Sequence, residues 1–263
     1  MTDHLLLDVP AASRGAHARL LGWPGAGNEY TVGDTRVHVG LPAWAGAPGL
    51  LLGVRGPDDG EASAAGTVGE AARLLGRRGL TLQPVPSGDG DAQLWSAEVN
   101  GLTVGFAPGC TSAESGATGA AAGTGAKGAA TENSAGQADR EIVGVDHVVL
   151  TSPNRDRTLA TLCARLGFDL RLDRVQSWGV HQLFLRRGPL LVEVVLQDDA
   201  DPAGPDLMWG IAWRTADIDV TCARLVAVGV TVGDIRRGHK PGTRVATVKD
   251  RDLGLPTLLI EQG

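Results

Sequence analysis

Three apolar stretches of the chain each carry one ionisable side chain, and these side chains are the residues most capable of chemistry. His147 lies within residues 145–150, Glu193 lies between two valines, and Glu261 ends the last apolar run. A carboxylate buried without a partner is costly, so Glu193 requires a metal ion, a cationic partner or a water-filled cleft. The simpler alternatives are a half-buried histidine, a salt bridge from Glu193 to Arg214, and an exposed position for Glu261.

The overall composition limits the class of protein. The chain has 263 residues, of which 43% are hydrophobic, and a net charge of -6, which indicates a globular protein and argues against a nucleic-acid-binding surface. Its three cysteines are widely spaced, which favours a reducing compartment over a disulfide framework or a zinc site. The sequence shows neither a secretory signal pattern nor an apolar run of about 18 residues. We therefore predict a cytoplasmic protein that binds neither nucleic acid nor membrane.

A change in composition separates two stretches in which helix and strand patterns alternate. From residue 109 to about 140, Ala, Gly, Ser and Thr dominate. Such a segment cannot bury enough apolar surface to offset its chain entropy. We therefore predict a domain at 1–108, a flexible linker at 109–140 and a second domain at 141–263.

The elements that must position His147 and Glu193 follow the order strand, helix, strand, strand, strand. Gly167 ends the predicted helix, and Glu193 lies on the last strand of this unit. The same order recurs up to Glu261. In the second stretch we expect strands near 143–150, 169–175, 181–186, 190–196, 208–214, 230–235, 243–248 and 257–262, and helices near 154–166 and 217–228. In the first stretch we expect a compressed version of the same order, with strands near 3–10, 29–32, 36–39, 50–54, 80–82, 93–99 and 102–106, and helices near 11–21 and 68–78.

Short motifs recur between the two stretches, which indicates duplicated domains. Residues 3–10 match residues 146–153 without a gap, through Asp-His, Leu and Pro at the same spacing. Two further matches join residues 18–22 to 164–167, and residues 72–75 to 223–226.

The second stretch resembles the vicinal oxygen chelate superfamily, which includes glyoxalase I, extradiol dioxygenases, and the bleomycin- and fosfomycin-resistance proteins. The resemblance implies an α+β fold, in which paired βαβββ modules form curved mixed sheets around a cleft, in two tandem domains. It also places metal ligands on the first and fourth strands of each module. The motifs that carry it are residues 146–150, 191–194, 210–214 with Asp217, and 257–261.

Residue by residue, the resemblance places His147, Glu193 and Glu261 at ligand positions on the cleft face of their strands. The third position, where a histidine is expected, is Gly210. One histidine and two carboxylates suggest Fe, Mn, Ni or Zn, although a catalytic site with two histidines would bind more tightly. Such a metal would polarise vicinal oxygens, and Glu193 or Glu261 could move a proton.

The first stretch matches this ligand pattern less well. His4 and His38 fall at the first two positions, and apolar residues take the others, which predicts a degenerate domain. If module one paired with module three, His4, His38, His147 and Glu193 would form one site. Neighbouring modules usually pair, because chains favour local connections.

Further candidates surround these positions. Arg214 shares its strand alternation with Gly210, so in the resemblance it faces the cleft, where it could hold an anion or neutralise Glu193. Residues 238–244 combine glycines, which let backbone approach a ligand, with basic side chains, although a basic surface hairpin is the simpler alternative. The candidate substrate-binding residues are Arg214, His239, Lys240, Arg244, Trp178 and His181.

Three functions of different classes stay open. The first is a glyoxalase-like enzyme, a metal-dependent lyase, isomerase or dioxygenase that acts on a small oxygen-rich substrate in the C-terminal cleft. The second is a metal-free protein that binds or sequesters a small molecule, as bleomycin-resistance proteins do, which Gly210 favours. The third is a scaffold whose N-terminal domain supports a homodimer.

Overall fold

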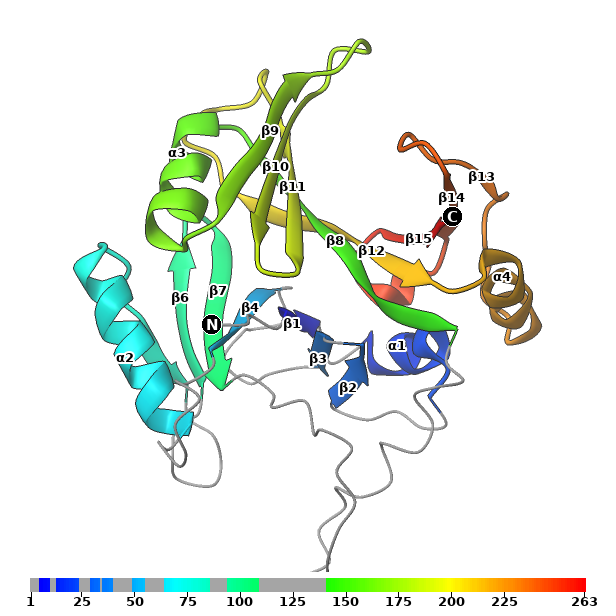
Figure 1. Ribbon diagram of the computed structural model, residues 1–263, viewed down its shortest axis with the longest axis horizontal. Helices are drawn as coiled ribbons and strands as arrows, with labels where there is room; N and C mark the ends of the chain where they lie inside the picture. The colour runs from blue at the N-terminus through cyan, green and yellow to red at the C-terminus, as the bar shows by residue number, and fades with distance from the viewer. Residues whose placement is uncertain are drawn as a thin grey trace, which may run out of the picture.

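The computed structural model describes residues 5–9, 13–23, 29–33, 35–39, 49–54, 64–85, 94–108 and 141–263. Their strands form two mixed sheets (Figure 1), with seven strands in the N-terminal part and eight in the C-terminal part. The predicted mixture of helices and curved, many-stranded sheets is confirmed. Residues 109–140 lie outside the described residues, so the division into two domains with a linker stays a prediction. None of the described helices is long and apolar enough to cross a membrane.

The C-terminal sheet consists of two units joined at a central antiparallel pair, β8 and β12. Strand β11 lies parallel to β8, and β15 lies parallel to β12. The order across the sheet is β13-β14-β15-β12-β8-β11-β10-β9. Its elements are β8 (Ile142–Ser152), α3 (Arg155–Leu159), η3 (Ala160–Arg165), β9 (Asp169–Val175), β10 (His181–Arg187), β11 (Leu190–Leu196), β12 (Leu207–Thr215), α4 (Ile218–Ala227), β13 (Arg236–Arg237), β14 (Thr243–Val248), η4 (Arg251–Leu253) and β15 (Thr257–Gln262).

Most of these elements form where the sequence predicted them. The side chain of Asn154 accepts a hydrogen bond from the Arg157 amide at 3.0 Å and so begins α3. Gly167 follows η3 with a φ of 76°, which a glycine adopts without strain. The strand predicted at 230–235 is wrong, because this segment pairs only through a single bridge and β13 begins later. Glycine and aspartate within that segment have low strand propensity.

The N-terminal sheet has the same arrangement around its own central antiparallel pair, β1 and β4. Strand β3 lies parallel to β1, and β7 lies parallel to β4. The order is β2-β3-β1-β4-β7-β6-β5. Its elements are β1 (Leu5–Val9), α1 (Arg14–Leu21), β2 (Glu29–Val32), β3 (Thr35–Val39), β4 (Gly49–Val54), α2 (Ala64–Arg77), β5 (Gln83–Val85), β6 (Leu94–Val99) and β7 (Leu102–Pro108).

The two units of this sheet differ in the number of strands described after the helix. The second unit has a strand, a helix and three further strands, as expected. Among the described residues, the first has two strands after its helix, close to the strands predicted at 29–32 and 36–39, and its full βαβββ order stays a prediction. The connection from α1 to β2 spans residues 22–28, whereas the corresponding C-terminal segment, 166–180, contains the whole of β9. The strand predicted at 80–82 forms three residues later, as β5.

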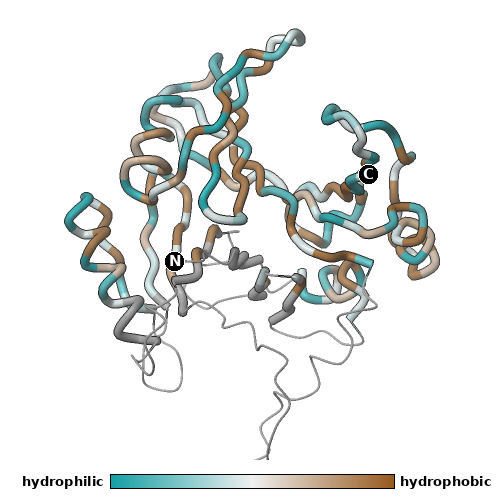
Figure 2. The backbone as a smooth tube through the Cα atoms, in the orientation of Figure 1, coloured by the Kyte–Doolittle hydropathy of each residue, from teal (hydrophilic) through white to brown (hydrophobic). Residues whose placement is uncertain are grey.

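A single core cluster contains residues of both sheets. Figure 2 shows hydrophobic residues along the strands that build it. Trp213 is 0% exposed, whereas Trp209 of the same strand is 53% exposed, although simple alternation places both on one face. The pairing of β12 with β8 skips from Met208 to Gly210. This bulge turns the side chain of Trp209 away from the alternation that the sequence suggested.

The two parts of the chain also contact each other through polar groups. Arg224 of α4 donates hydrogen bonds to the carbonyl oxygens of Arg19, at 2.8 Å, and Leu20, at 2.9 Å, near the end of α1. The amide of Asp206 donates to the carbonyl oxygen of Asn100 at 2.6 Å. Figure 1 shows α1 close to the start of β8. The N-terminal sheet therefore packs directly on the C-terminal part.

Candidate functional site

A cavity of about 1190 Å³ lies within the C-terminal sheet. It is lined by alternate residues of several strands, as strand geometry requires. Val145 and His147 of β8 face it, and so do Leu191 and Glu193 of β11. The cleft that the sequence predicted on this face of β8 and β11 is therefore present.

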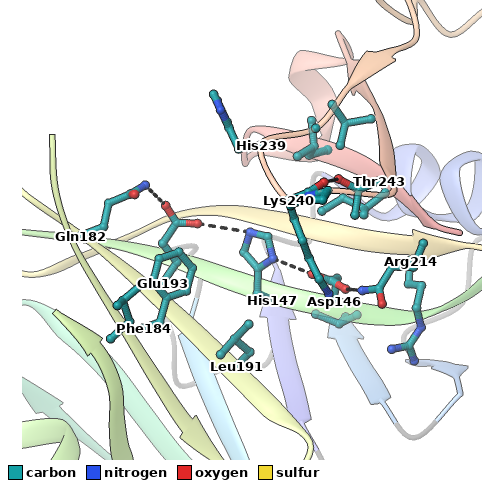
Figure 3. A pocket seen from close by; sticks show the side chains of 18 of the residues that line it. Asp146, His147, Gln182, Phe184, Leu191, Glu193, Arg214, His239, Lys240 and Thr243 are labelled. Carbon is teal, nitrogen blue, oxygen red and sulfur yellow. Dashed lines mark hydrogen bonds and ion pairs between the residues drawn. The ribbon is translucent and has the colours of Figure 1, made fainter. Parts of the chain in front are cut away.

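The centre of the cavity wall is a row of three ionisable side chains, Asp146, His147 and Glu193 (Figure 3). Nδ1 of His147 lies 2.9 Å from Oδ2 of Asp146. Nε2 of His147 lies 3.4 Å from Oε2 of Glu193. The imidazole of His147 thus lies between two carboxyl groups, that of Asp146 on the same strand and that of Glu193 on β11.

A bulge in β8 explains how two successive residues reach the same cavity. Ala212 pairs with His147 and Trp213 pairs with Val145, so Asp146 has no residue opposite it. An unpaired residue of this kind bends the strand and redirects its side chain, and such bulges often occur next to active sites. Simple alternation, on which the prediction rested, would place Asp146 on the other face.

Glutamine side chains extend the row at both ends. Nε2 of Gln182 donates to Oε1 of Glu193 at 2.5 Å, and Nε2 of Gln176 donates to Oε1 of Gln182. At the other end, Nε2 of Gln262 donates to Oδ1 of Asp146. The sequence reasoning missed Asp146 and all three glutamines. Gln182 could have been found, because it alternates with Phe184 on a strand that lines the cavity.

The two carboxyl groups on His147 differ electrostatically. Burial raises the pKa of Glu193, and the charges of His147 and His239 and the hydrogen bond from Gln182 oppose this effect only in part. Burial also acts to raise the pKa of Asp146, but the hydrogen bond and charge of His147, helped by Gln262 and Arg214, bring that pKa below its ordinary value. Pairs whose surroundings move their pKa values apart are typical of acid–base sites.

Glu261 lies on the opposite face of β15, outside the cavity. Its Oε2 accepts a hydrogen bond from the amide of Ile218 at 2.8 Å, at the start of α4. The residues of β15 that line the cavity are Leu258, Ile260 and Gln262. The predicted cleft position of Glu261 is therefore wrong by one residue, which in a strand exchanges the two faces. Arg244 lies on that same outer side, where its Nη1 is 3.3 Å from Oε1 of Glu261 and its Nη2 contacts Asp219.

The metal set that the resemblance implied does not come together. Glu261 is on the other face, and both ring nitrogens of His147 face carboxylates. At Gly210, an added Cβ would lie 3.0 Å from the carbonyl oxygen of Pro256, so a larger side chain would be crowded there. Throughout the described part of the chain, no group of three or more His, Cys, Asp or Glu side chains is placed to hold a metal ion. The residues present therefore do not fit a three-ligand metal centre.

Four of the predicted substrate-binding residues line the cavity, namely Arg214, His239, Lys240 and Trp178. The rings of Trp178 and His239 stack, with centroids 4.9 Å apart. His181 is turned away from the cavity, and its Nε2 lies 2.7 Å from Oδ1 of Asp173. Its neighbour Gln182 takes the cavity-facing position instead. Sequence reasoning also missed three basic residues of the lining, Arg174, Arg186 and Arg236.

The alternative site with two N-terminal histidines lies largely outside the described residues. His4 is not among them, and of His38 only the backbone in β3 is described. That pairing of modules also conflicts with the observed sheets, because β1 pairs with β3 and β4, and β8 pairs with β11 and β12. Units that are neighbours in the chain pair in both sheets.

Comparison with known proteins places this region in a family. Residues 146–247 match the family described as "Glyoxalase/Bleomycin resistance protein/Dioxygenase superfamily". Methylmalonyl-CoA epimerase from Mycobacterium tuberculosis is a similar solved structure, 21% identical with a TM-score of 0.38, over 46% of this chain and 89% of that chain. A variant of methylmalonyl-CoA epimerase from Streptomyces coelicolor, in complex with 2-nitronate-propionyl-CoA, is 23% identical with a TM-score of 0.38, over 46% of this chain and 99% of that chain. No curated protein sequence matches this chain.

Proposed function

Residues 146–247 belong to the glyoxalase/bleomycin resistance protein/dioxygenase superfamily, and on this premise we propose that the C-terminal cavity is an acid–base active site for a small oxygen-bearing substrate. The observation that carries this proposal is the carboxyl group of Glu193. It lies in the cavity wall next to His147, in surroundings that raise its pKa. A general base works best when its pKa is near the working pH. The reaction class is proton abstraction beside a carbonyl group, as in an isomerase or lyase.

Each member of the row has a distinct part in this reaction. Glu193 takes the proton from the substrate carbon, and the electron pair moves onto the carbonyl oxygen. Gln182 holds Oε1 of Glu193, which leaves Oε2 toward His147. Asp146 fixes the ring of His147 by accepting a hydrogen bond from Nδ1. Nε2 is then the nitrogen left for the substrate, and in the protonated ring it donates to the substrate oxygen as charge develops there.

The described residues support proton transfer better than oxygen chemistry. Many members of this superfamily use divalent metals. Non-haem iron oxygenases commonly bind iron through two histidines and one carboxylate on one face, and among the described residues no group of three or more His, Cys, Asp or Glu side chains is placed to hold a metal ion. The proposal is therefore limited to reactions that move protons. The cytoplasmic location and the homodimer predicted from the sequence are not required for it and stay predictions.

A second candidate is binding or sequestration without catalysis. The volume of about 1190 Å³ exceeds the roughly 300–1,000 Å³ of ordinary small-molecule pockets. A cavity of this size can enclose a whole small molecule, as a protein that sequesters its ligand requires. Catalysis and sequestration are distinguished by whether the bound molecule exchanges a carbon-bound proton with the solvent.

Proton NMR in heavy water tests the proposal directly. A panel of 2-oxo acids, 2-hydroxy ketones and carboxylic thioesters is incubated with the protein, and loss of the carbon-bound proton signal is followed. We expect the wild type to accelerate exchange for at least one compound, and Glu193→Gln to reduce that rate roughly 10²- to 10⁴-fold.

Glu261→Gln is the matched control, because this carboxylate lies on the outer face of the same sheet. It should retain the wild-type exchange rate. Equal exchange by Glu193→Gln and the wild type would contradict the proposal. Saturable binding of panel compounds without any exchange would favour sequestration.

A further inference from the structure

Basic side chains are concentrated in the cavity although the chain as a whole is acidic. The net charge of the chain is -6. The carboxylates that line the cavity are Asp146 and Glu193, and both already contact His147. Against these two stand five basic residues of the lining, Arg174, Arg186, Arg214, Arg236 and Lys240.

Most of these basic groups have no carboxylate partner among the described residues. Arg174 donates to Oε1 of Gln176 at 2.8 Å, and Arg186 donates to the carbonyl oxygen of Gly188 at 2.9 Å, and both acceptors are neutral. Arg236 and Lys240 form no ion pair with any described carboxylate. Cationic groups that line one concave site focus a positive potential there, which attracts anions.

Arg236 and Lys240 lie close together in the chain, Arg236 on β13 and Lys240 in the turn that leads from β13 to β14. His239 and Lys240 project from this turn beside the row of ionisable residues (Figure 3). Hydrophilic residues predominate in this turn (Figure 2). We call Arg236, His239 and Lys240 the basic wall.

The remainder of the lining offers a different surface. Apolar side chains from both units also line it, and the ring of Trp178 stacks on the ring of His239 in the basic wall. Trp178 precedes β10 in one unit, whereas His239 precedes β14 in the other, so the stack joins the two units at the cavity. The apolar lining residues include Leu172, Val175 and Phe184 of one unit and Val245, Leu258 and Ile260 of the other.

We propose that the ligand of this cavity is an amphipathic organic anion, whose oxyanion head group binds Arg236 and Lys240 while its apolar part lies along the apolar lining. This inference rests on the proposed function, because it names the substrate class of the same site. Arginine and lysine are the side chains best suited to phosphate, sulfonate and carboxylate oxygens. Burial of the hydrocarbon part of the ligand against these apolar side chains removes both from water, which favours binding.

Two fluorescent probes of similar shape separate the contributions of charge and apolar surface. 1-Anilinonaphthalene-8-sulfonate carries a sulfonate group, and N-phenyl-1-naphthylamine lacks it. We expect the wild type to bind both probes saturably. The double variant Arg236→Gln/Lys240→Gln should bind the sulfonate at least about tenfold more weakly, since two charged contacts are removed, and should bind the neutral probe as the wild type does. Unchanged binding of the neutral probe also shows that the variant keeps its cavity.

The control is Arg237→Gln/Lys249→Gln, which removes two positive charges from residues outside the cavity lining. It should bind both probes normally. Decyl phosphate should displace the sulfonate probe at a concentration at least about tenfold lower than decanol does. The inference is overturned if the two double variants bind the sulfonate equally, or if decanol displaces it as effectively as decyl phosphate.

These outcomes are independent of the test of the proposed function. Glu193→Gln should lose proton exchange and still bind the sulfonate probe. Suppose that Arg236→Gln/Lys240→Gln binds the sulfonate probe as the wild type does, while Glu193→Gln loses proton exchange. The proposed ligand class is then wrong, and the proposed acid–base function stands. If Glu193→Gln keeps the full rate of proton exchange while Arg236→Gln/Lys240→Gln binds the sulfonate probe more weakly, the acid–base function is wrong and the ligand class stands.

Discussion

In both sheets an antiparallel pair of strands lies at the centre and a parallel strand flanks each member. The pair is β1 with β4 in the N-terminal sheet and β8 with β12 in the C-terminal sheet. On the N-terminal central strands, the described buried side chains are apolar, for example Leu50 and Leu52. On β8 of the C-terminal pair, one face is apolar and the other carries His147, which lines the cavity beside Glu193 of the flanking strand β11.

The two sheets share the same strand pairing and differ in the side chains on one face of their central strands. The fold therefore provides the place for a site, whereas a few side chains determine what that site can do. The N-terminal sheet has a supporting part in this arrangement. Thr35 of β3 lines the C-terminal cavity, and α1 receives the hydrogen bonds of Arg224. We therefore infer that the N-terminal part stabilises the C-terminal part and completes one side of its cavity.

Arg224→Ala tests this supporting contact and has the largest expected effect on stability. The guanidinium group donates to two carbonyl oxygens near the end of α1 and also contacts Glu141. Hydrogen bonds from charged groups contribute about 1.5–3 kcal/mol each, and the partial exposure of this side chain reduces that. We expect the free energy of unfolding, measured by urea denaturation, to fall by about 2 kcal/mol.

Arg73→Ala is the matched control, because Arg73 is exposed and occupies the equivalent Ala-Arg-Leu motif of α2. Its effect should stay within about 0.5 kcal/mol, as for most surface substitutions. If the two variants were equally stable, the contact between the two parts would not support the fold.

His17 provides a smaller test, through pH. It is buried in α1, at the position that Cys163 occupies in the C-terminal helix when the Ala-Arg-Leu motifs are matched. Burial lowers the pKa of His17, although its hydrogen bond with the carbonyl oxygen of Ser13 and the charge of Asp250 oppose this. The unfolded chain therefore binds a proton near an ordinary pKa of about 6.5, whereas the folded protein binds it only at lower pH.

His17 should consequently leave the free energy of unfolding unaffected above about pH 6.5 and lower it as the pH drops toward 5. We expect His17→Gln to weaken this pH dependence in urea titrations at pH 7 and pH 5, because the variant has no buried imidazole to protonate. Parallel losses in the wild type and the variant would show that another group is responsible.

Much of the fold could be predicted from local pattern. Apolar alternation located all but one of the strands of the two C-terminal units, and glycines marked the helix ends. The meeting of His147 with Glu193 also followed, because both lie mid-strand on strands that the resemblance makes neighbours. The bulges at Asp146 and Trp209 could not be predicted, since they depend on pairing with a distant strand.

The error at Glu261 has a similar origin. Glu261 and Gln262 are adjacent, and either could face the cavity when the register of the last strand is unknown. The choice of Glu261 produced a three-ligand metal set, whereas the observed face offers Gln262 to Asp146. The charged lining of the cavity was missed in part for another reason. Arg174, Arg186 and Arg236 resemble ordinary surface residues until the sheet is folded.

The central claim is that this cavity moves protons with its own side chains. The most direct test is to measure metal content by mass spectrometry and proton exchange by NMR on the same sample, before and after dialysis against a chelator. We expect the exchange rate to remain within about twofold after metal removal, because the row of Asp146, His147 and Glu193 persists. Loss of exchange on chelation, with recovery after addition of one of the ions Fe, Mn, Ni or Zn, would contradict the claim.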